Sequence, residues 1–432
     1  MGSFIKKQTK NEKVLDKHTE RWYNIYVVLR PFGESVREEQ NQGKTHTNRS
    51  IRNRFVRKKM EGLDVMNEEK QIREVCKQFR IVGEFQYYEV INSGHINTTY
   101  RVFYLRNGEI KDYILQRVNT YVFHDPVGVM DNISSVTEYI RAKIKAKCGT
   151  AKRNVLHYQK TEEDEYYVCM PDGGFWRCCR YIDDSVCFEK TDSLKVLEES
   201  GKAFGEFQLY LADYPVEKLC IVIPHFHNTV RRYAAFRDAM QEDEMGRTKE
   251  VRDVIDGYLA VEEIATRCYR LQKQGVLPLR VTHNDTKLSN ILFDANTHEH
   301  LSVIDLDTVM PGLVAFDFGD AIRVAGSTSD EDEKDLSKVA LDIQKYEAVA
   351  RGFVTTLKDS LTQAEKDSLA LGAVAMTLEC GVRFLTDYIN GDKYFKIHYP
   401  EQNLVRAKCQ LALGMDMIAH LDEMQEIIKK YS

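Results

Sequence analysis

The feature that most constrains this 432-residue chain is a strand-forming segment, residues 279–306, set among sequence with helical periodicity. An apolar run ends in a polar loop that holds Asp285, and Asn290 follows five residues later. Two further apolar runs flank a polar turn, and the second ends at Asp305. A chain that returns antiparallel brings the end of its second strand beside the start of its first. The sequence therefore predicts a small hairpin that gathers Asp285, Asn290 and Asp305 at one end.

Residues 80–180 have the alternation of apolar and polar residues that is typical of strands. Asn107-Gly108 lies between two such runs and is a strong hairpin signal. We expect strands at residues 85–91, 98–105, 113–118, 155–159 and 166–170, and a helix at residues 128–147. These elements predict a twisted antiparallel sheet with one helix inserted between its strands.

After residue 180 the apolar residues follow helical spacing instead. We expect helices at residues 193–211, 231–240, 251–274, 334–357, 364–390 and 404–430. The predicted fold class is α+β, with two lobes. Residues 1–67 form a basic N-terminal extension that we expect to be flexible, residues 68–180 form a β-rich N-lobe, and residues 181–432 form a mostly helical C-lobe that carries the catalytic hairpin.

The charge is small and unevenly distributed. The formal net charge is −5, but residues 1–60 contain 15 Lys and Arg against 6 Asp and Glu. An acidic total argues against a protein that holds nucleic acid by bulk charge. The basic N-terminal extension is either solvated or contacts an anionic partner.

The ten cysteines are scattered, and no pair has the CxxC spacing of a metal or redox motif. This pattern favours reduced thiols, as in a cytosolic protein. The N-terminus has no apolar segment of a signal peptide, and no apolar run approaches the roughly 18 residues that suggest a membrane span. We therefore expect a cytoplasmic protein with no membrane partner.

The predicted hairpin has the groups that phosphoryl transfer requires. One carboxylate orients the acceptor hydroxyl and receives its proton, and hard oxygen ligands hold Mg²⁺ on the nucleotide phosphates. In that interpretation Asp285 is the catalytic base, and Asn290 and Asp305 bind the metal. Single Asn and Asp residues are common in turns, so the prediction depends on the set rather than on any one of them.

A separate motif, Asp317-Phe318-Gly319, could be mistaken for the metal-binding motif of protein kinases. It lies 32 residues after Asp285, at the predicted start of a helix, whereas Asp305 ends a strand 20 residues after Asp285. We therefore expect Asp317 and Asp320 to be charges at a helix N-terminus or braces of the loop. Asp307 is either a second metal ligand or a support for Asp305, and we favour the support.

At these residues the chain resembles the aminoglycoside phosphotransferase/choline kinase superfamily, small-molecule kinases with a protein-kinase-like fold. The strings HNDTKLSN, VIDLDTVMPG, DFGDAIR and RFLTDYINGDKYF are similar to those of N-acetylhexosamine 1-kinases, as are INSGHINTTYRV and LQRVNTYVFHDP. The likeness covers about residues 70–432. It implies an ATP- and Mg²⁺-dependent enzyme that phosphorylates the anomeric hydroxyl of N-acetylglucosamine or N-acetylgalactosamine.

The resemblance places the nucleotide in the N-lobe. The loop Ser93-Gly94-His95-Ile96-Asn97 between two strands is able to lay backbone N–H groups over phosphates, although one glycine is also what a simple turn needs. Arg117 occupies the position of the strand lysine of protein kinases, with Glu138 as its candidate ion-pair partner. The alternative is that Arg117 is a solvated residue of the strand.

The same resemblance implies that Arg383 and Tyr394 contact the sugar while Asp285 holds its reacting hydroxyl. Arg383 lies in a mostly apolar helical segment, where a guanidinium must be paired, bound or solvated. An ion pair of Arg383 with Asp387 or Asp317, and a packing role for Tyr394, are the alternatives. His227 lies in a segment typical of the family, but the sequence assigns it no role.

Two other classes of function stay open. One is a different hydroxyl kinase of the superfamily, acting on an aminoglycoside, choline or homoserine. The other is a pseudokinase scaffold, which would be expected to have lost one of the three hairpin residues. The expected partners are ATP and a small-molecule sugar, with no nucleic acid, and we favour a monomer.

Overall fold

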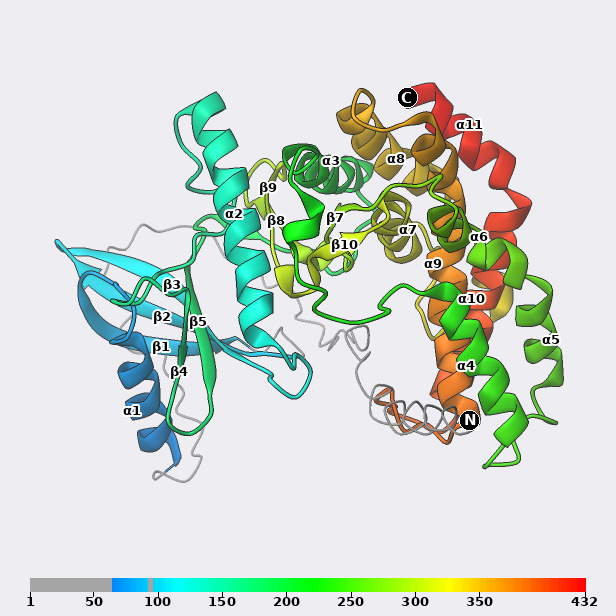
Figure 1. The fold of residues 1–432 in the computed structure, drawn as a ribbon, viewed down its shortest axis with the longest axis horizontal. Coiled ribbons are helices and arrows are strands. Elements are labelled where there is room, and N and C mark those ends of the chain that lie inside the picture. Colours follow the sequence, from blue (N-terminus) through cyan, green and yellow to red (C-terminus); the bar gives the residue numbers. More distant parts are fainter. Residues whose placement is uncertain (1–63, 92–95) are drawn as a thin grey trace, which may run out of the picture.

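The computed structural model describes residues 64–91 and 96–432. A sheet-rich N-terminal part and a helical C-terminal part lie on either side of a small group of short strands (Figure 1). The α+β class and the two-lobe arrangement that the sequence predicts are confirmed. Most of the predicted N-terminal extension lies outside the described residues, which begin with α1 (Asp64–Cys76).

The N-lobe is a five-stranded sheet in the order β1-β2-β3-β5-β4, and every neighbouring pair is antiparallel. Its strands are β1 (Glu84–Ile91), β2 (Thr98–Arg106), β3 (Glu109–Val118), β4 (Tyr167–Cys169) and β5 (Phe175–Arg180). Asn107 and Gly108 both have positive φ angles, 51° and 85°, as the tight turn between β2 and β3 requires.

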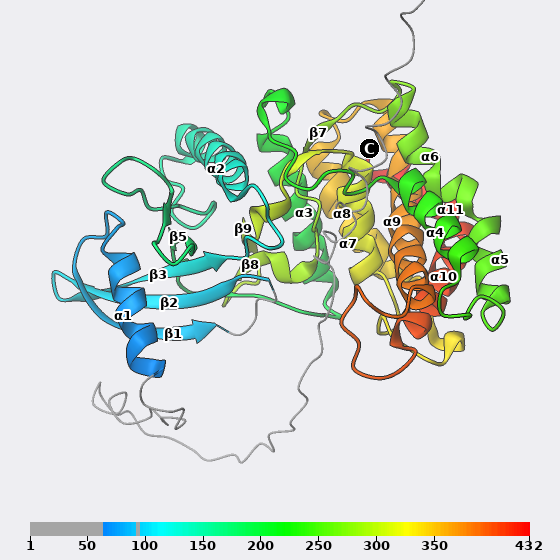
Figure 2. The same cartoon turned by 60° about the horizontal axis from the view of Figure 1, so that its bottom comes forward.

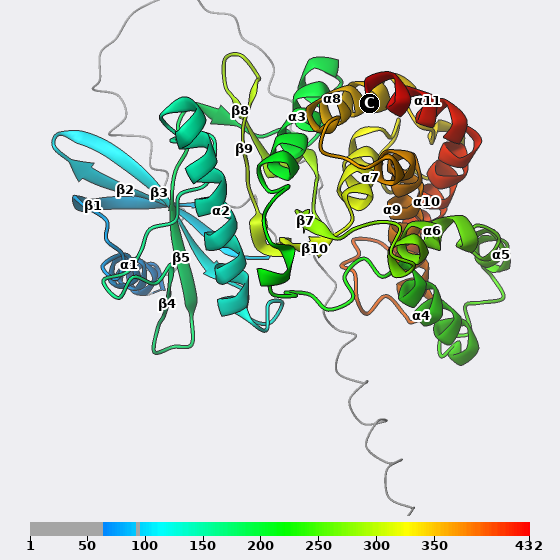
Figure 3. The ribbon, with the colours of Figure 1, turned by 45° about the horizontal axis from the view of Figure 1, so that its top comes forward.

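The two faces of this sheet pack against different helices. Leu115 on β3 and Trp176 on β5 belong to the hydrophobic cluster that also contains Ile72 of α1. Val118 and Phe175 point the other way, into the cluster formed with α2 (Pro126–Cys148). The two helices therefore cover opposite faces of the sheet, and α2 separates the sheet from the C-lobe (Figure 3).

The long helix α2 begins and ends where its sequence dictates. Asp125 Oδ1 accepts a hydrogen bond from the Gly128 N–H at 2.9 Å, and Pro126 occupies the first turn, where no N–H is needed. Gly149 ends the helix with a φ of 74°. The helix predicted at residues 128–147 is thus confirmed.

One predicted strand is wrong and another strand escaped prediction. Residues 155–159 form only an isolated bridge, between Tyr158 and Cys179, because their contact with β5 is too short to make a ladder. The strand β5, between β3 and β4, lies where we expected no strand. Its two buried cysteines and two arginines conceal the alternation that marks a strand in sequence.

The C-lobe contains nine helices among the described residues (Figure 2). They are α3 (Leu194–Tyr210), α4 (Thr229–Glu242), α5 (Arg252–Ala260), α6 (Glu262–Lys273), α7 (Val314–Ala325), α8 (Ile343–Leu357), α9 (Gln363–Ile389), α10 (Gln402–Ala419) and α11 (Leu421–Tyr431). The helices predicted at residues 251–274 and 404–430 are each divided in two, at Val261 and His420.

Five short strands lie between the two lobes. They are β6 (Ser185–Val186), β7 (Arg280–Thr282), β8 (Ile291–Asp294), β9 (His300–Val303) and β10 (Met310–Gly312). Strands β8 and β9 form the predicted antiparallel hairpin, and β10 pairs with β7. The hairpin therefore sits where it faces both lobes.

Helix α9 is the central helix of the C-lobe. By length and composition it could cross a membrane, but 94% of its apolar window is buried within the protein. Its crossing with α7 depends on glycines, because a Cβ on Gly372 would lie 1.9 Å from the Ala315 carbonyl oxygen and one on Gly319 would lie 2.2 Å from the Gly372 oxygen. The two backbones are in direct contact.

The substitution Gly372→Ala should therefore force α7 and α9 apart. We expect it to lower the free energy of unfolding by about 3 kcal/mol or more, measured by urea denaturation. Gly257→Ala is the matched control, since its Cβ would meet only the flexible end of Leu411. Equal stability of the two variants would contradict the direct backbone contact.

The hairpin is fastened to α3 through His300. His300 Nδ1 lies 2.7 Å from Glu199 Oε2, and Nε2 lies 3.5 Å from Glu206 Oε2. Burial acts to lower the pKa of His300, but the hydrogen bonds with Glu199 and Glu206 outweigh it and raise the pKa to about 9.

A histidine whose pKa rises on folding stabilises the protein fully below its unfolded pKa of about 6.5. This contribution is lost as the pH rises from about 6.5 to 9. We expect the loss to amount to roughly 1–3 kcal/mol in urea denaturation curves, and to be absent in His300→Gln. His298→Gln, an exposed change on the same hairpin, should keep the slope. A slope that persists in His300→Gln would contradict the assignment.

Candidate active site

The catalytic loop, residues 283–287, leaves β7 in a conformation that its own side chains fix. Asn284 has a φ of 65°, a left-handed conformation that asparagine tolerates better than most residues. Its side chain accepts a hydrogen bond from Thr282 Oγ1 at 3.0 Å and donates to the Thr308 carbonyl at 2.9 Å. These two hydrogen bonds fix the conformation of the turn, and Asp285 follows it directly in the chain.

Asp317, in the first turn of α7, holds the same loop from the side. Its carboxylate accepts hydrogen bonds from the backbone N–H groups of His283 and Asn284 at 2.9 and 2.8 Å, and from Gln208 Nε2 at 2.6 Å. Burial raises the pKa of Asp317, and these interactions partly offset that effect. The expectation that Asp317 braces the loop is confirmed.

Asp320 extends the brace by one helical turn. Its Oδ2 accepts a hydrogen bond from the Thr286 N–H at 3.1 Å, and its Oδ1 accepts one from Arg323 Nε at 3.0 Å. Arg323 also reaches Glu331 at 3.0 Å. The loop is therefore tied to α7 by two carboxylates, neither of which is placed as a metal ligand.

Three hydrogen bonds join the loop to the hairpin. His283 Nε2 lies 2.9 Å from the Ile304 oxygen, the Ile304 N–H donates to the Asn290 oxygen at 2.9 Å, and Asn290 Nδ2 donates to the Asp285 oxygen at 2.9 Å. Asp305 follows Ile304 directly, with a φ of 59°. These backbone contacts bring the segments that carry Asp285, Asn290 and Asp305 together, as expected for the predicted hairpin.

The electrostatics of this place favour a cation. Burial raises the pKa of Asp305 to about 6, repulsion from Asp307 and Asp285 adds to the rise, and Lys287 opposes it. Asp285 is 1% exposed, and its Oδ1 is buried without a hydrogen bond. No cluster of three or more His, Cys, Asp or Glu side chains forms a metal cage in the described part of the chain. The carboxylate of Asp305 and the amide oxygen of Asn290 are hard oxygen donors that fit Mg²⁺ and leave positions for phosphate oxygens.

Lys287 is a member of the site that the sequence analysis did not single out. Its Nζ lies 3.2 Å from Asp285 Oδ2. Burial acts to lower its pKa, but the charges of Asp285 and Asp305 outweigh that effect and raise it. A lysine two residues after Asp285, in the same loop, was the signal available in the sequence.

Arg177 on β5 is the second residue that was missed. It is 2% exposed, and it forms an ion pair and hydrogen bond with Asp307, in the 3-10 turn Leu306–Thr308. Arg177 Nε also donates to Gln116 Oε1 at 2.9 Å. Asp307 is thus held by an arginine of the N-lobe. No sequence signal could show this, because 130 residues separate the partners.

The structure places Arg117 with a different ion-pair partner from the one that the sequence predicts. The sheet register pairs Arg117 with Trp176 and Gln116 with Arg177, so Arg117 lies on the α1 face and Gln116 on the face toward Asp307. Arg117 Nη2 lies 3.3 Å from Asp172, whereas Glu138 lies 3.6 Å from Arg141. The expected Arg117–Glu138 pair is therefore wrong, because the pleat turns Arg117 away from α2.

Of the predicted phosphate loop, Ser93, Gly94 and His95 lie outside the described residues. Asn97, which follows them, is well placed at the start of β2. Its Nδ2 donates to Asp307 Oδ2 at 2.7 Å, and its Oδ1 accepts from the Asn119 N–H at 2.9 Å. The end of this loop is therefore fixed beside the hairpin.

Arg383 and Tyr394 lie together on the C-lobe. Burial acts to lower the pKa of Arg383, but its neighbours, Tyr394 first among them, raise it. Asp387 Oδ1 and Oδ2 accept hydrogen bonds from the backbone N–H groups of Tyr394 and Phe395, each at 2.8 Å. The Asp387 carboxylate thus holds the loop that carries Tyr394.

The chain was compared with known families and solved structures. The family described as "Phosphotransferase enzyme family" matches residues 88–350, more than half of the chain. An aminoglycoside phosphotransferase from Alicyclobacillus acidocaldarius is 11% identical, with a TM-score of 0.51, over 83% of this chain and 96% of the other. A choline kinase from Cryptosporidium parvum is also 11% identical, with a TM-score of 0.51, over 84% and 98%. The two structures share the fold of this chain.

Asp317→Asn should loosen the catalytic loop, since the amide offers one acceptor oxygen where the carboxylate offers two. We expect the free energy of unfolding to fall by about 1–3 kcal/mol and kcat to fall with it, measured by urea denaturation and steady-state kinetics. Asp192→Asn removes only a surface pair with Lys345, so it should change stability by less than about 1 kcal/mol. Wild-type stability and kcat in Asp317→Asn would contradict the bracing role.

Proposed function

The chain belongs to the phosphotransferase enzyme family, and from that premise we propose that it transfers the γ-phosphoryl group of ATP to the anomeric hydroxyl of an N-acetylhexosamine. The product is the sugar 1-phosphate. The observation that carries the kinase part of the proposal is the convergence of Asp285, Asn290 and Asp305 beside the half-buried Lys287. The sugar is favoured by the family strings around Arg383 and Tyr394.

Asp285 acts on the acceptor hydroxyl. Its unpartnered Oδ1 is the free acceptor in the site, so it orients the hydroxyl and takes its proton as the oxygen attacks the γ-phosphorus. The bond from that phosphorus to the bridging oxygen of ADP breaks in the same step. The carboxylate is held for this role by the Asn284 turn and the Asp317 brace.

Asn290 and Asp305 would hold Mg²⁺, which when bound neutralises charge on the phosphates. The chain itself supplies further positive charge at Lys287, which is close enough to Asp285 to reach a phosphoryl group in transit. Arg177 keeps Asp307 in place below the metal residues and neutralises its charge. Phosphoryl transfer is catalysed mostly by positioning and charge of this kind.

The reaction is tested with a coupled ADP-release assay on the full chain, with N-acetylglucosamine, N-acetylgalactosamine, choline, homoserine and kanamycin as acceptors. We expect turnover with the amino sugars and a phosphorus NMR spectrum typical of a 1-phosphate. Turnover with only the other acceptors, or a 6-phosphate product, would refute the proposal.

Asp285→Asn should lower kcat by roughly 10²- to 10⁴-fold, because the amide cannot accept the proton. The measurement is the same assay at saturating ATP and sugar. Asp294→Asn, a change at the far end of the same hairpin, is the matched control and should keep kcat within about twofold. Similar activity in Asp285→Asn and wild type would remove Asp285 from the chemistry.

A further inference from the structure

A buried chain of contacts leads from the catalytic loop into helix α9. His227, in the segment before α4, places Nε2 3.3 Å from the Asn284 oxygen, one residue before Asp285. The other ring nitrogen, Nδ1, lies 3.1 Å from Glu379 Oε1. Glu379 lies one helical turn before Arg383 on α9. The contacts therefore join the catalytic carboxylate to the helix that carries Arg383.

Glu379 has an oxygen that the protein leaves without a donor. The side chain is 1% exposed, and Oε2 is buried without a hydrogen bond. Among the described residues, Glu379 Oε2 and Asp285 Oδ1 are the two buried carboxylate oxygens in this condition. A buried acceptor without a donor is costly, so both oxygens are suited to a ligand that supplies hydroxyl or N–H groups.

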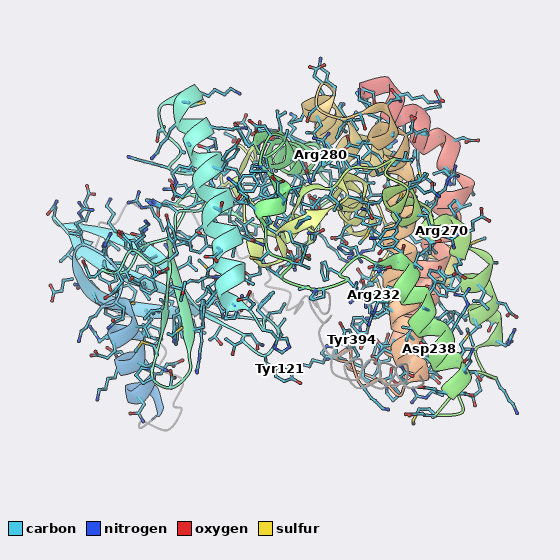
Figure 4. All side chains as sticks on the ribbon, viewed as in Figure 1. Tyr121, Arg232, Asp238, Arg270, Arg280 and Tyr394 are labelled. Carbon is cyan, nitrogen blue, oxygen red and sulfur yellow. The ribbon has the colours of Figure 1, made fainter. Side chains whose placement is uncertain are left out.

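The charges around Glu379 keep it ionised. Burial acts to raise its pKa, but the hydrogen bond and charge of His227, followed by the charges of Arg232 and Arg383, outweigh that effect and lower the pKa. Arg232 on α4 and Tyr394 on the loop after α9 both lie on the side of the helical lobe that faces α2 (Figure 4). The surroundings of Glu379 are therefore rich in positive groups.

We propose that Glu379 is a specificity-determining residue of the acceptor site, whose Oε2 accepts a hydrogen bond from a second hydroxyl or the amide N–H of the sugar. This inference rests on the proposed function and deepens it. The sugar spans the two unpartnered oxygens, with its reacting hydroxyl on Asp285 and another donor on Glu379. Tyr394, on the loop after α9, packs against both large hydrophobic clusters at this boundary.

The surroundings also select the class of acceptor. A quaternary ammonium or a polycationic aminoglycoside would meet the charges of Arg232 and Arg383 beside Glu379, and like charges repel. A neutral, polyhydroxylated acceptor satisfies the free oxygen without that repulsion. The site therefore favours an uncharged sugar over choline or kanamycin.

The test is Glu379→Gln in the full chain, measured with the coupled assay. A hydrogen bond to a charged group is worth enough that its loss should raise the sugar KM roughly 10- to 100-fold, with the ATP KM within about twofold of wild type. Deoxy analogues of the sugar identify the group that donates to Glu379. The analogue that lacks this group should bind wild type more weakly than the sugar does, but should bind Glu379→Gln about as well as the sugar does.

Glu365→Gln is the matched control, because Glu365 is a buried carboxylate on the same helix that is already paired with Arg280. It should keep the sugar KM within about twofold of wild type. If Glu379→Gln does not fold, Glu379→Asp retains the charge and withdraws the oxygen by one methylene. It should still raise the sugar KM, whereas a purely structural role would lower the melting temperature and leave that KM unchanged.

The outcomes separate the two proposals. Wild type that phosphorylates the sugar, with a variant whose sugar KM is unchanged, overturns the role of Glu379 alone. Wild type that phosphorylates choline or kanamycin but no sugar overturns both the role of Glu379 and the proposed function.

Discussion

The buried ion pair between Arg177 and Asp307 is the interaction on which the arrangement of the two lobes depends. Arg177 belongs to the N-lobe strand β5, and Asp307 to the turn that follows the hairpin. Separating them would leave two charges buried without partners, which is far more costly than losing a surface pair. Asn97 also donates a hydrogen bond to Asp307, and Gln116 accepts one from Arg177. The lobes therefore meet at a fixed point next to Asp305.

This fixed point determines how the cleft is able to move. Rotation of the N-lobe about the Arg177–Asp307 contact preserves the pair, whereas translation of the lobe breaks it. The end of the predicted phosphate loop is tied to the same carboxylate through Asn97, so it keeps its position beside the hairpin during such a rotation. The acceptor residues lie on the other lobe, where Asp387 and Asp317 hold their loops independently.

Local sequence patterns predicted what depends on local structure. The Asn107-Gly108 turn, the α2 helix and the hairpin that gathers Asp285, Asn290 and Asp305 all follow from neighbours in sequence. The strand β5 was missed because its burial on both faces removes the alternation. Arg177 and Glu379 were missed because their partners come from distant elements, and Arg117 was misplaced because one residue of strand register reverses the face. The role of Lys287 was within reach of the sequence, since it lies in the catalytic loop itself.

Helix α9 runs without interruption for 27 residues, and its middle is pressed against α7 at Gly372. Near one end, Glu365 holds Arg280 at the start of the strand that leads into the catalytic loop. Glu379 and Arg383 lie toward the other end of the helix. Because the two backbones are in contact at Gly372, α9 cannot shift along α7 there without a clash. The strand that leads to Asp285 and the segment that carries Arg383 are thus both set against one helix whose position along α7 is fixed.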